Sequence, residues 1–150
     1  MTDLRVCWVF QSAGQGDLAL GACREMERHG IRPVMASWFT TTCRHLYEQG
    51  CKDVYYLPSL LPQVNGLDSH QLEDLDQRYS PPGLAALMYS ESRIRYLKDS
   101  AKLLPLTTQY LSFWERFLEE QEIDAVILWQ SQALACRTLW TVARAKGLPH

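Results

Sequence analysis

The clearest signals of the fold lie in residues 4–36, LRVCWVFQSAGQGDLALGACREMERHGIRPVMA. It opens with an apolar run, Leu4 to Phe10, which is typical of a buried strand in a parallel sheet. A turn of small residues follows, and apolar residues then recur at helical spacing. Asp17 is the expected N-cap of this helix and Gly30 its left-handed C′ residue, before a second strand at 33–36. The order is therefore strand, loop, helix, strand.

The rest of the chain repeats this order in outline. We expect a short helix from Thr40–Thr42 to Gln49 closed by Gly50, a third strand from Asp53 to Leu57, a fourth from Asp124 to Trp129, and a helix from Ser131 to Gly147. Alternating strands and helices predict an α/β domain in which helices cover both faces of a parallel sheet of about four strands.

Two segments interrupt the alternation. Residues 58–83 are rich in proline, glycine and acids, which predicts an irregular connection with at most a helical turn at 71–76. Farther on, apolar residues return at helical spacing, and Pro105 is expected to end or kink one helix and to start another. After Gly147, Leu148-Pro149 begins the pattern again. We therefore expect residues 1–150 to be a single domain and the N-terminal half of a longer two-domain protein, with a complete four-stranded protein as the alternative.

Composition excludes several classes of protein. The chain has 150 residues, of which 47% are hydrophobic, and a formal net charge of −2, so neither disorder nor binding of nucleic acid through a strongly basic surface is expected. No run approaches the ~20 apolar residues of a membrane-spanning helix, and the N-terminus is not a convincing signal peptide. Five cysteines, an odd and scattered set, indicate reduced thiols and a cytoplasmic location.

Ligands of open parallel sheets bind beyond the carboxyl ends of the strands. This rule selects three loops as candidate binding segments, and their residues are Ser12, Gly14, Gln15, Gly16 and Asp17 after the first strand, Ser37, Trp38, Phe39 and Thr40 after the second, and Gln130, Ser131 and Gln132 after the fourth. The glycines would let a ligand approach the backbone at the positive end of a helix. They would equally serve a tight turn alone, and the sequence leaves both interpretations open.

Known cofactor patterns do not fit. Gly14 and Gly16 supply two glycines of the dinucleotide fingerprint and Ala19 the third position, but no acidic residue follows the second strand to hold a ribose. A P-loop lysine motif is absent. Cys43 and His45 match no zinc spacing and fall on nearly opposite sides of a helix. We therefore expect no cofactor and no metal.

Two other groups of side chains could have either a structural or a ligand-binding role. Glu91 and Arg95 form an i,i+4 helix pair, while Arg93 and Arg95 would also suit an anionic or sugar ligand. Trp129 and Gln130 combine an aromatic face with an amide, which suits sugar recognition, although a tryptophan at the end of a buried strand is more often part of the core.

The chain also resembles a known family. The phrase Gly14-Gln15-Gly16-Asp17 leading into the helix that ends His29-Gly30 is similar to the opening of GT-B glycosyltransferases. The phrases Ile123-Asp124-Ala125-Val126-Ile127-Leu128-Trp129-Gln130 and Val142-Ala143-Arg144-Ala145-Lys146-Gly147-Leu148-Pro149 resemble the N-terminal half of bacterial capsular and surface-polysaccharide biosynthesis proteins.

This resemblance implies a Rossmann-like three-layer half that contacts the glycan acceptor, while a C-terminal half holds most of the nucleotide-sugar donor. The catalytic base would be Asp17 or Glu91. No nucleic acid and no transmembrane segment are expected, whereas peripheral membrane contact stays open. The alternatives are a non-catalytic α/β module that binds a ligand or a protein, and half of a sugar-nucleotide epimerase.

Overall fold

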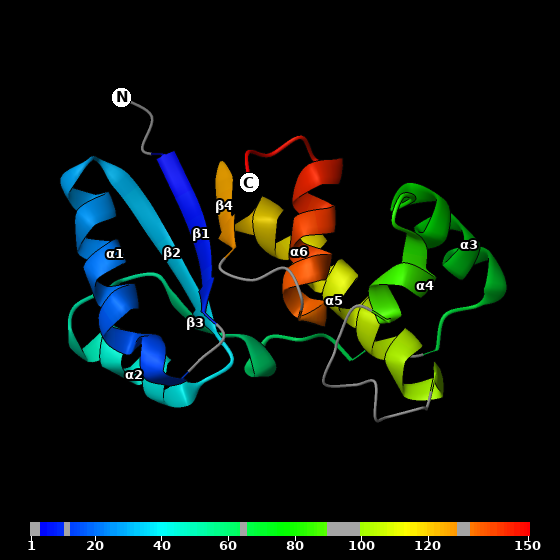
Figure 1. The fold of residues 1–150 in the computed structure, drawn as a ribbon, viewed down its shortest axis with the longest axis horizontal. Helices are drawn as coiled ribbons and strands as arrows, with labels where there is room; N and C mark the ends of the chain where they lie inside the picture. Colours follow the sequence, from blue (N-terminus) through cyan, green and yellow to red (C-terminus); the bar gives the residue numbers. More distant parts are fainter. Residues whose placement is uncertain (1–3, 11–12, 64–65, 90–99, 129–132) are drawn as a thin grey trace. The chain divides into compact units, whose positions relative to one another are not determined.

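A computed structural model gives the structure of residues 4–10, 13–63, 66–89, 100–128 and 133–150. The predicted fold class is confirmed, because the chain forms an α/β structure with a four-stranded, all-parallel sheet flanked by helices, consistent with a Rossmann-like three-layer domain (Figure 1). The elements are β1 (Leu4–Phe10), η1 (Ala13–Gln15), α1 (Gly16–Arg28), β2 (Ile31–Ser37), α2 (Thr40–Glu48), β3 (Val54–Tyr56), η2 (Leu57–Ser59), α3 (Ser69–Arg78), α4 (Gly83–Met88), α5 (Ser100–Glu120), β4 (Ala125–Leu128) and α6 (Leu134–Ala145).

The strands follow the order β3-β2-β1-β4, with β1 in the interior of the sheet. The register pairs Cys7 of β1 with Val34 of β2 on one side and with Val126 of β4 on the other. All three side chains are buried. A strand between two parallel neighbours needs apolar residues on both faces, which explains the apolar run from Val6 to Phe10 of β1.

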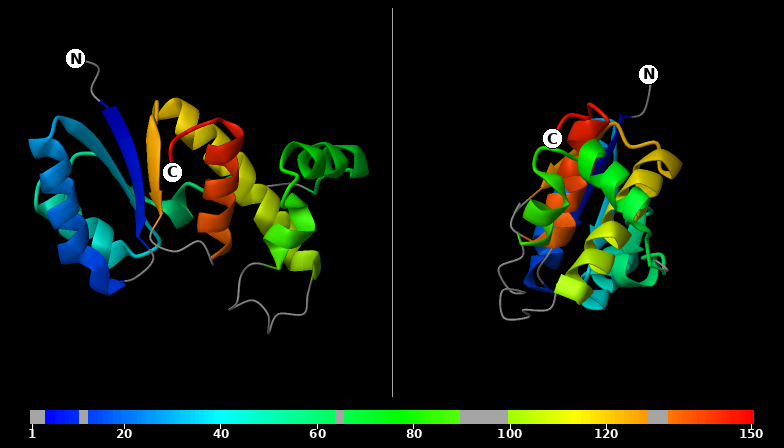
Figure 2. Two further views of the ribbon diagram at one scale, coloured as in Figure 1. Left: turned by 45° about the horizontal axis from the view of Figure 1, so that its top comes forward. Right: turned by 90° about the vertical axis from the view of Figure 1, so that its right-hand side faces the viewer.

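The chain divides into two compact units, and each is described by itself. The first comprises residues 1–60, 122–129 and 149–150, and the second 61–121 and 130–148. In the first, α1 and α2 lie on the same face of the sheet (Figure 2). They enclose a core of six buried side chains from strands, helices and the turn after α2, namely Phe10, Ala19, Cys23, Met35, Leu46 and Cys51. Burial, together with a hydrogen bond to Cys51, raises the pKa of the Cys23 thiol to about 12.

An acidic side chain ties three strands together at the amino edge of the sheet. The carboxylate of Asp53, just before β3, accepts a hydrogen bond of 2.8 Å from Nε of Arg32 on β2. It also lies 3.9 Å from a guanidinium nitrogen of Arg5 on β1. Asp124, just before β4, links the fourth strand to β1, because its carboxylate accepts a hydrogen bond of 2.7 Å from the backbone N–H of Arg5. The side chain of Asp53 is only 16% exposed, so these contacts are partly shielded from water.

The second unit is helical. The α5 and α6 helices pack against each other around Trp114, whose side chain is fully buried. Its indole N–H donates a hydrogen bond of 2.8 Å to the backbone carbonyl of Ala135 on α6. Tyr79 follows α3, and its hydroxyl donates to the Glu115 carboxylate on α5, which also pairs with Arg78 at 2.9 Å. Burial, followed by these contacts with Glu115, raises the pKa of Tyr79.

Three local predictions need correction. The segment expected to be irregular contains the ten-residue helix α3, begun by a capping box in which Asp68 accepts the backbone N–H of Gln71 and the Gln71 side chain accepts that of Asp68. Pro105 lies inside α5, so it does not end one helix and start another. Asp17 lies in the first turn of α1, and the residue at the N-cap is Gln15.

Candidate functional site

Two loops meet where β1 and β2 end. The chain leaves β1 and enters α1 through η1, and it leaves β2 and enters α2 through Trp38 and Phe39. The buried hydroxyl of Ser37 joins these connections, because it donates to the Phe10 carbonyl and accepts the Phe39 backbone N–H, each at 3.1 Å. The α2 helix also packs against both η1 and α1. In its described part, the carboxyl edge of the first unit is therefore built from two of the three segments that the sequence selected.

A close contact between helices explains Gly16. This residue opens α1, and its backbone is not left-handed, so a tight turn does not require glycine here. A Cβ placed on it would lie 3.2 Å from Cδ2 of His45 on α2. Glycine at this position therefore makes room for an imidazole ring of the protein itself.

The imidazole ring of His45 also lies close to Asp17, the candidate catalytic base. Nε2 of His45 lies 3.2 Å from Oδ1 of Asp17, close enough for an ion pair when the ring is protonated. Nε2 is shielded from solvent and has no partner of good hydrogen-bond geometry among the described residues. The Asp17 side chain is 97% exposed. A ligand at this edge would consequently meet the carboxylate of Asp17 and not Nε2 of His45.

The neighbouring candidates line the same edge. Gly14 is exposed and Gln15 is half-buried, both in η1. Trp38 is half-buried in the β2–α2 connection, and Thr40 is the exposed first residue of α2. The edge thus presents a carboxylate, an amide, a hydroxyl and part of an indole, which can bind hydroxyl groups and an apolar ring face.

The other predicted site residues lie outside the described residues. These are Ser12, Glu91, Arg93, Arg95, Gln130 and Ser131. Their assignment to a substrate site stays a prediction.

The pairing of His45 with Asp17 could not be predicted from the sequence, in which His45 stands out only through its nearness to Cys43. The two residues are 28 positions apart, and no spacing rule links a residue within one helix to the start of another. The only available signal was general: consecutive helices on one face of a parallel sheet pack side by side.

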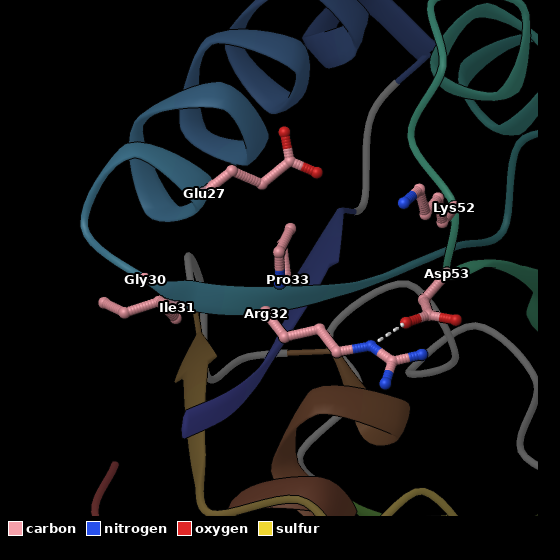
Figure 3. Close-up of a pocket in the computed structure, with 7 residues that line it drawn as sticks. All are labelled: Glu27, Gly30, Ile31, Arg32, Pro33, Lys52 and Asp53. Atoms are coloured by element: carbon pink, nitrogen blue, oxygen red, sulfur yellow. Dashed lines mark hydrogen bonds and ion pairs between the residues drawn. The ribbon is translucent and has the colours of Figure 1, made fainter. Parts of the chain in front are cut away.

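A hollow of the first unit lies at the opposite edge of the sheet. It measures about 440 Å³ and lies at the amino ends of β2 and β3, between the end of α1 and residues 52–53. Figure 3 shows Arg32 reaching along it to Asp53, while the charged ends of Glu27 and Lys52 stand apart. Since ligands of parallel sheets bind at the carboxyl edge, and since Arg32 and Asp53 hold strands together here, we interpret this hollow as structural.

In the described part of the chain, no group of three or more His, Cys, Asp or Glu side chains is placed to hold a metal ion. The described helices include none with the length and hydropathy needed to cross a bilayer. The fold and the site define an α/β protein with a polar cluster at the carboxyl edge of a parallel sheet. No family model, curated protein or solved structure gave a match to this chain.

The contact between Gly16 and His45 can be tested by substitution. We expect Gly16→Val to lower the free energy of unfolding by about 1–3 kcal/mol, because the added carbons press on the imidazole ring. Gly21 is the matched control: it lies on the exposed side of α1, with no atom within 4 Å of an added Cβ. Gly21→Val should be nearly neutral, since valine and glycine differ by only a few tenths of a kcal/mol in helix propensity. Equal urea midpoints for the two variants would contradict this packing.

Proposed function

We propose that this chain is the acceptor-side half of a glycosyltransferase that acts in surface-polysaccharide biosynthesis. The glycan acceptor would bind at the carboxyl edge of the first unit, and a C-terminal half would hold most of the nucleotide-sugar donor. The family resemblance at Gly14–Asp17 and in the phrases around β4 and α6 motivates this assignment. The free cysteines are consistent with catalysis in the cytoplasm, with peripheral contact to the membrane on which such glycans are assembled.

The observation that carries the proposal is the position of Asp17. Its exposed carboxylate lies in the first turn of the helix that follows β1, 3.2 Å from the His45 imidazole. This is the edge of the sheet where α/β proteins bind substrates. The lack of a ribose-binding acid after β2 argues against a dinucleotide there, whereas hydroxyl-binding groups favour a sugar.

The chemistry assigns each group a role. An acceptor hydroxyl attacks the anomeric carbon of the donor sugar, a new C–O bond forms, and the bond between that carbon and the nucleotide's phosphate oxygen breaks. The hydroxyl proton passes to the carboxylate of Asp17, which acts as general base. His45 is a positioning residue, because its Nε2 lies 3.2 Å from Oδ1 of Asp17 and attracts the carboxylate when the ring is protonated.

The decisive experiment separates the two halves. The 150-residue chain is produced once alone and once as part of the longer, two-half protein. Each preparation is incubated separately with nucleotide sugars and oligosaccharide acceptors. Turnover is measured as the release of free nucleoside diphosphate or nucleoside monophosphate. We expect release from the longer protein and none from the 150-residue chain, because the donor site would lie in the other half.

Turnover by the chain alone would refute the division of labour between the halves. No release from the longer protein with any donor and acceptor would refute the transferase itself. Interconversion of the donor sugar without transfer would favour an epimerase, and ligand binding without any reaction would favour a binding module.

A further inference from the structure

The α6 helix has one narrow face that is not buried. Eight of its twelve residues are buried. Apart from Ala145 at the end of the helix, the other residues are Arg137, Trp140 and Arg144, spaced three and four positions apart. Such spacing puts all three side chains on one side of the helix. We call this set the α6 stripe.

The stripe is organised around its tryptophan. The guanidinium carbon of Arg137 lies 4.9 Å from the centroid of the Trp140 ring, and that of Arg144 lies 5.2 Å from it. Both distances fall within the range of cation–π attraction. Guanidinium groups held against a ring lose less freedom when they bind a ligand, so the stripe is partly preorganised.

The charges of the two arginines are not neutralised by acids in the described part of the chain. Arg144 donates a hydrogen bond of 3.1 Å to the carbonyl of Pro81, an uncharged partner. The described contacts of the Arg137 side chain are limited to Trp140. Acids on the adjoining α5 are engaged elsewhere: Glu115 pairs with Arg78, and Glu119 with Lys146. The α4 helix, which also packs on α6, has no acidic residue.

We propose that the α6 stripe binds an acidic oligosaccharide, with sugar carboxylates at Arg137 and Arg144 and a sugar ring beside Trp140. Guanidinium groups bind carboxylates through paired hydrogen bonds, and the indole offers apolar surface to sugar C–H groups. Seven residues of helix separate the arginines by about 10 Å, similar to the span of two linked sugar rings. The choice of a sugar chain rests on the proposed function, in which a growing glycan is the acceptor.

Other anionic occupants fit less well. Nucleic-acid binding draws on many phosphate contacts, whereas the stripe offers two arginines on a chain of net charge −2. An acidic peptide could satisfy the guanidinium groups, but it would not use the tryptophan surface in the same way. These occupants are therefore tested as competitors.

The test uses the 150-residue chain and four probes: a short oligogalacturonate, a neutral maltooligosaccharide, an oligothymidylate and an oligoglutamate. Binding is followed by NMR, through the indole N–H of Trp140 and the Nε–H of both arginines. We expect oligogalacturonate to bind with a dissociation constant near or below about 1 mM and to shift these signals, and the neutral sugar not to bind at about 10 mM.

Variants of Arg137 locate the binding. Arg137→Gln should weaken oligogalacturonate binding about tenfold, and Arg137→Lys should recover only part of it, since lysine keeps the charge but not the paired donors. Arg116→Gln is the matched control, because Arg116 is an exposed arginine on α5 and the charge change is the same. Circular dichroism checks that all variants fold.

Several results would overturn the proposal. These are absence of oligogalacturonate binding, equal loss in Arg137→Gln and Arg116→Gln, or tighter binding of the oligothymidylate or oligoglutamate. The outcome is separate from that of the transferase assay, because a chain that binds acidic sugars while the longer protein transfers none would keep the stripe and refute the enzyme.

Discussion

Asp17→Asn should lower kcat of the longer, two-half protein at least about 100-fold, because asparagine keeps the shape of aspartate but cannot accept the proton of an acceptor hydroxyl. Stability should change little, since Asp17 is almost fully exposed and loses its attraction to the start of α1, about 0.3–1 kcal/mol, together with a solvent-exposed charge contact to His45. Turnover is measured as nucleotide release under saturating donor and acceptor, beside a thermal melt of each variant.

Two further variants make this result specific. Asp74→Asn is the matched control, because Asp74 is an exposed acid on α3 and the substitution is the same. It should leave kcat unchanged. His45→Gln should lower kcat more than it raises the KM for acceptor, as expected of a residue that orients the base. Near-normal turnover of Asp17→Asn would reduce Asp17 to a residue that stabilises the first turn of α1.

Trp114→Ala should have the largest effect on stability, a loss of about 3–5 kcal/mol in the free energy of unfolding. The ring is fully buried and makes edge contacts with Phe113 at 4.7 Å and Phe117 at 5.8 Å between centroids. Truncation would remove these contacts and leave a cavity between α5 and α6. The loss is a large share of the 5–15 kcal/mol that stabilises an ordinary domain.

Trp114→Phe provides the comparison, measured by urea unfolding with circular dichroism. It keeps an aromatic ring but loses the hydrogen bond to the Ala135 carbonyl. This carbonyl also accepts the Thr138 hydroxyl at 2.9 Å, so it is not left without a donor. We expect a loss of about 1–2 kcal/mol. A loss below about 1 kcal/mol for Trp114→Ala would show that the ring is not central to this core.

Local signals in the sequence were sufficient for much of the fold. The apolar run of β1 predicted an interior parallel strand, and Gly30, Gly50 and Gly147 end their helices with φ of 71°, 90° and 69°. Left-handed C′ residues are readable because few other residues tolerate that conformation. The α3 helix was missed because its weakly apolar pattern and flanking prolines outweighed the Asp68 and Gln71 capping signal.

The site was predicted only in part. Gly16 and Asp17 follow from the rule that ligands bind beyond strand ends, but their neighbour His45 comes from a different helix. The bridge from Asp53 to Arg5 and Arg32 likewise joins three strands. Such pairs depend on how elements pack, and one sequence gives no spacing from which to infer them.

The placement of the five thiols makes the chain a natural reporter of its own opening. Cys7, Cys23 and Cys51 are buried in the first unit, Cys136 is buried in the second, and Cys43 is half-buried. A thiol reagent reacts with the thiolate, so burial slows modification of the closed form, and the raised pKa of Cys23 slows it further at that residue. Peptide mapping after timed exposure would therefore follow the opening of the two units separately in the same unlabelled protein. Modification of Cys136 reports opening of the helical unit, and modification of Cys7, Cys23 and Cys51 reports opening of the first unit.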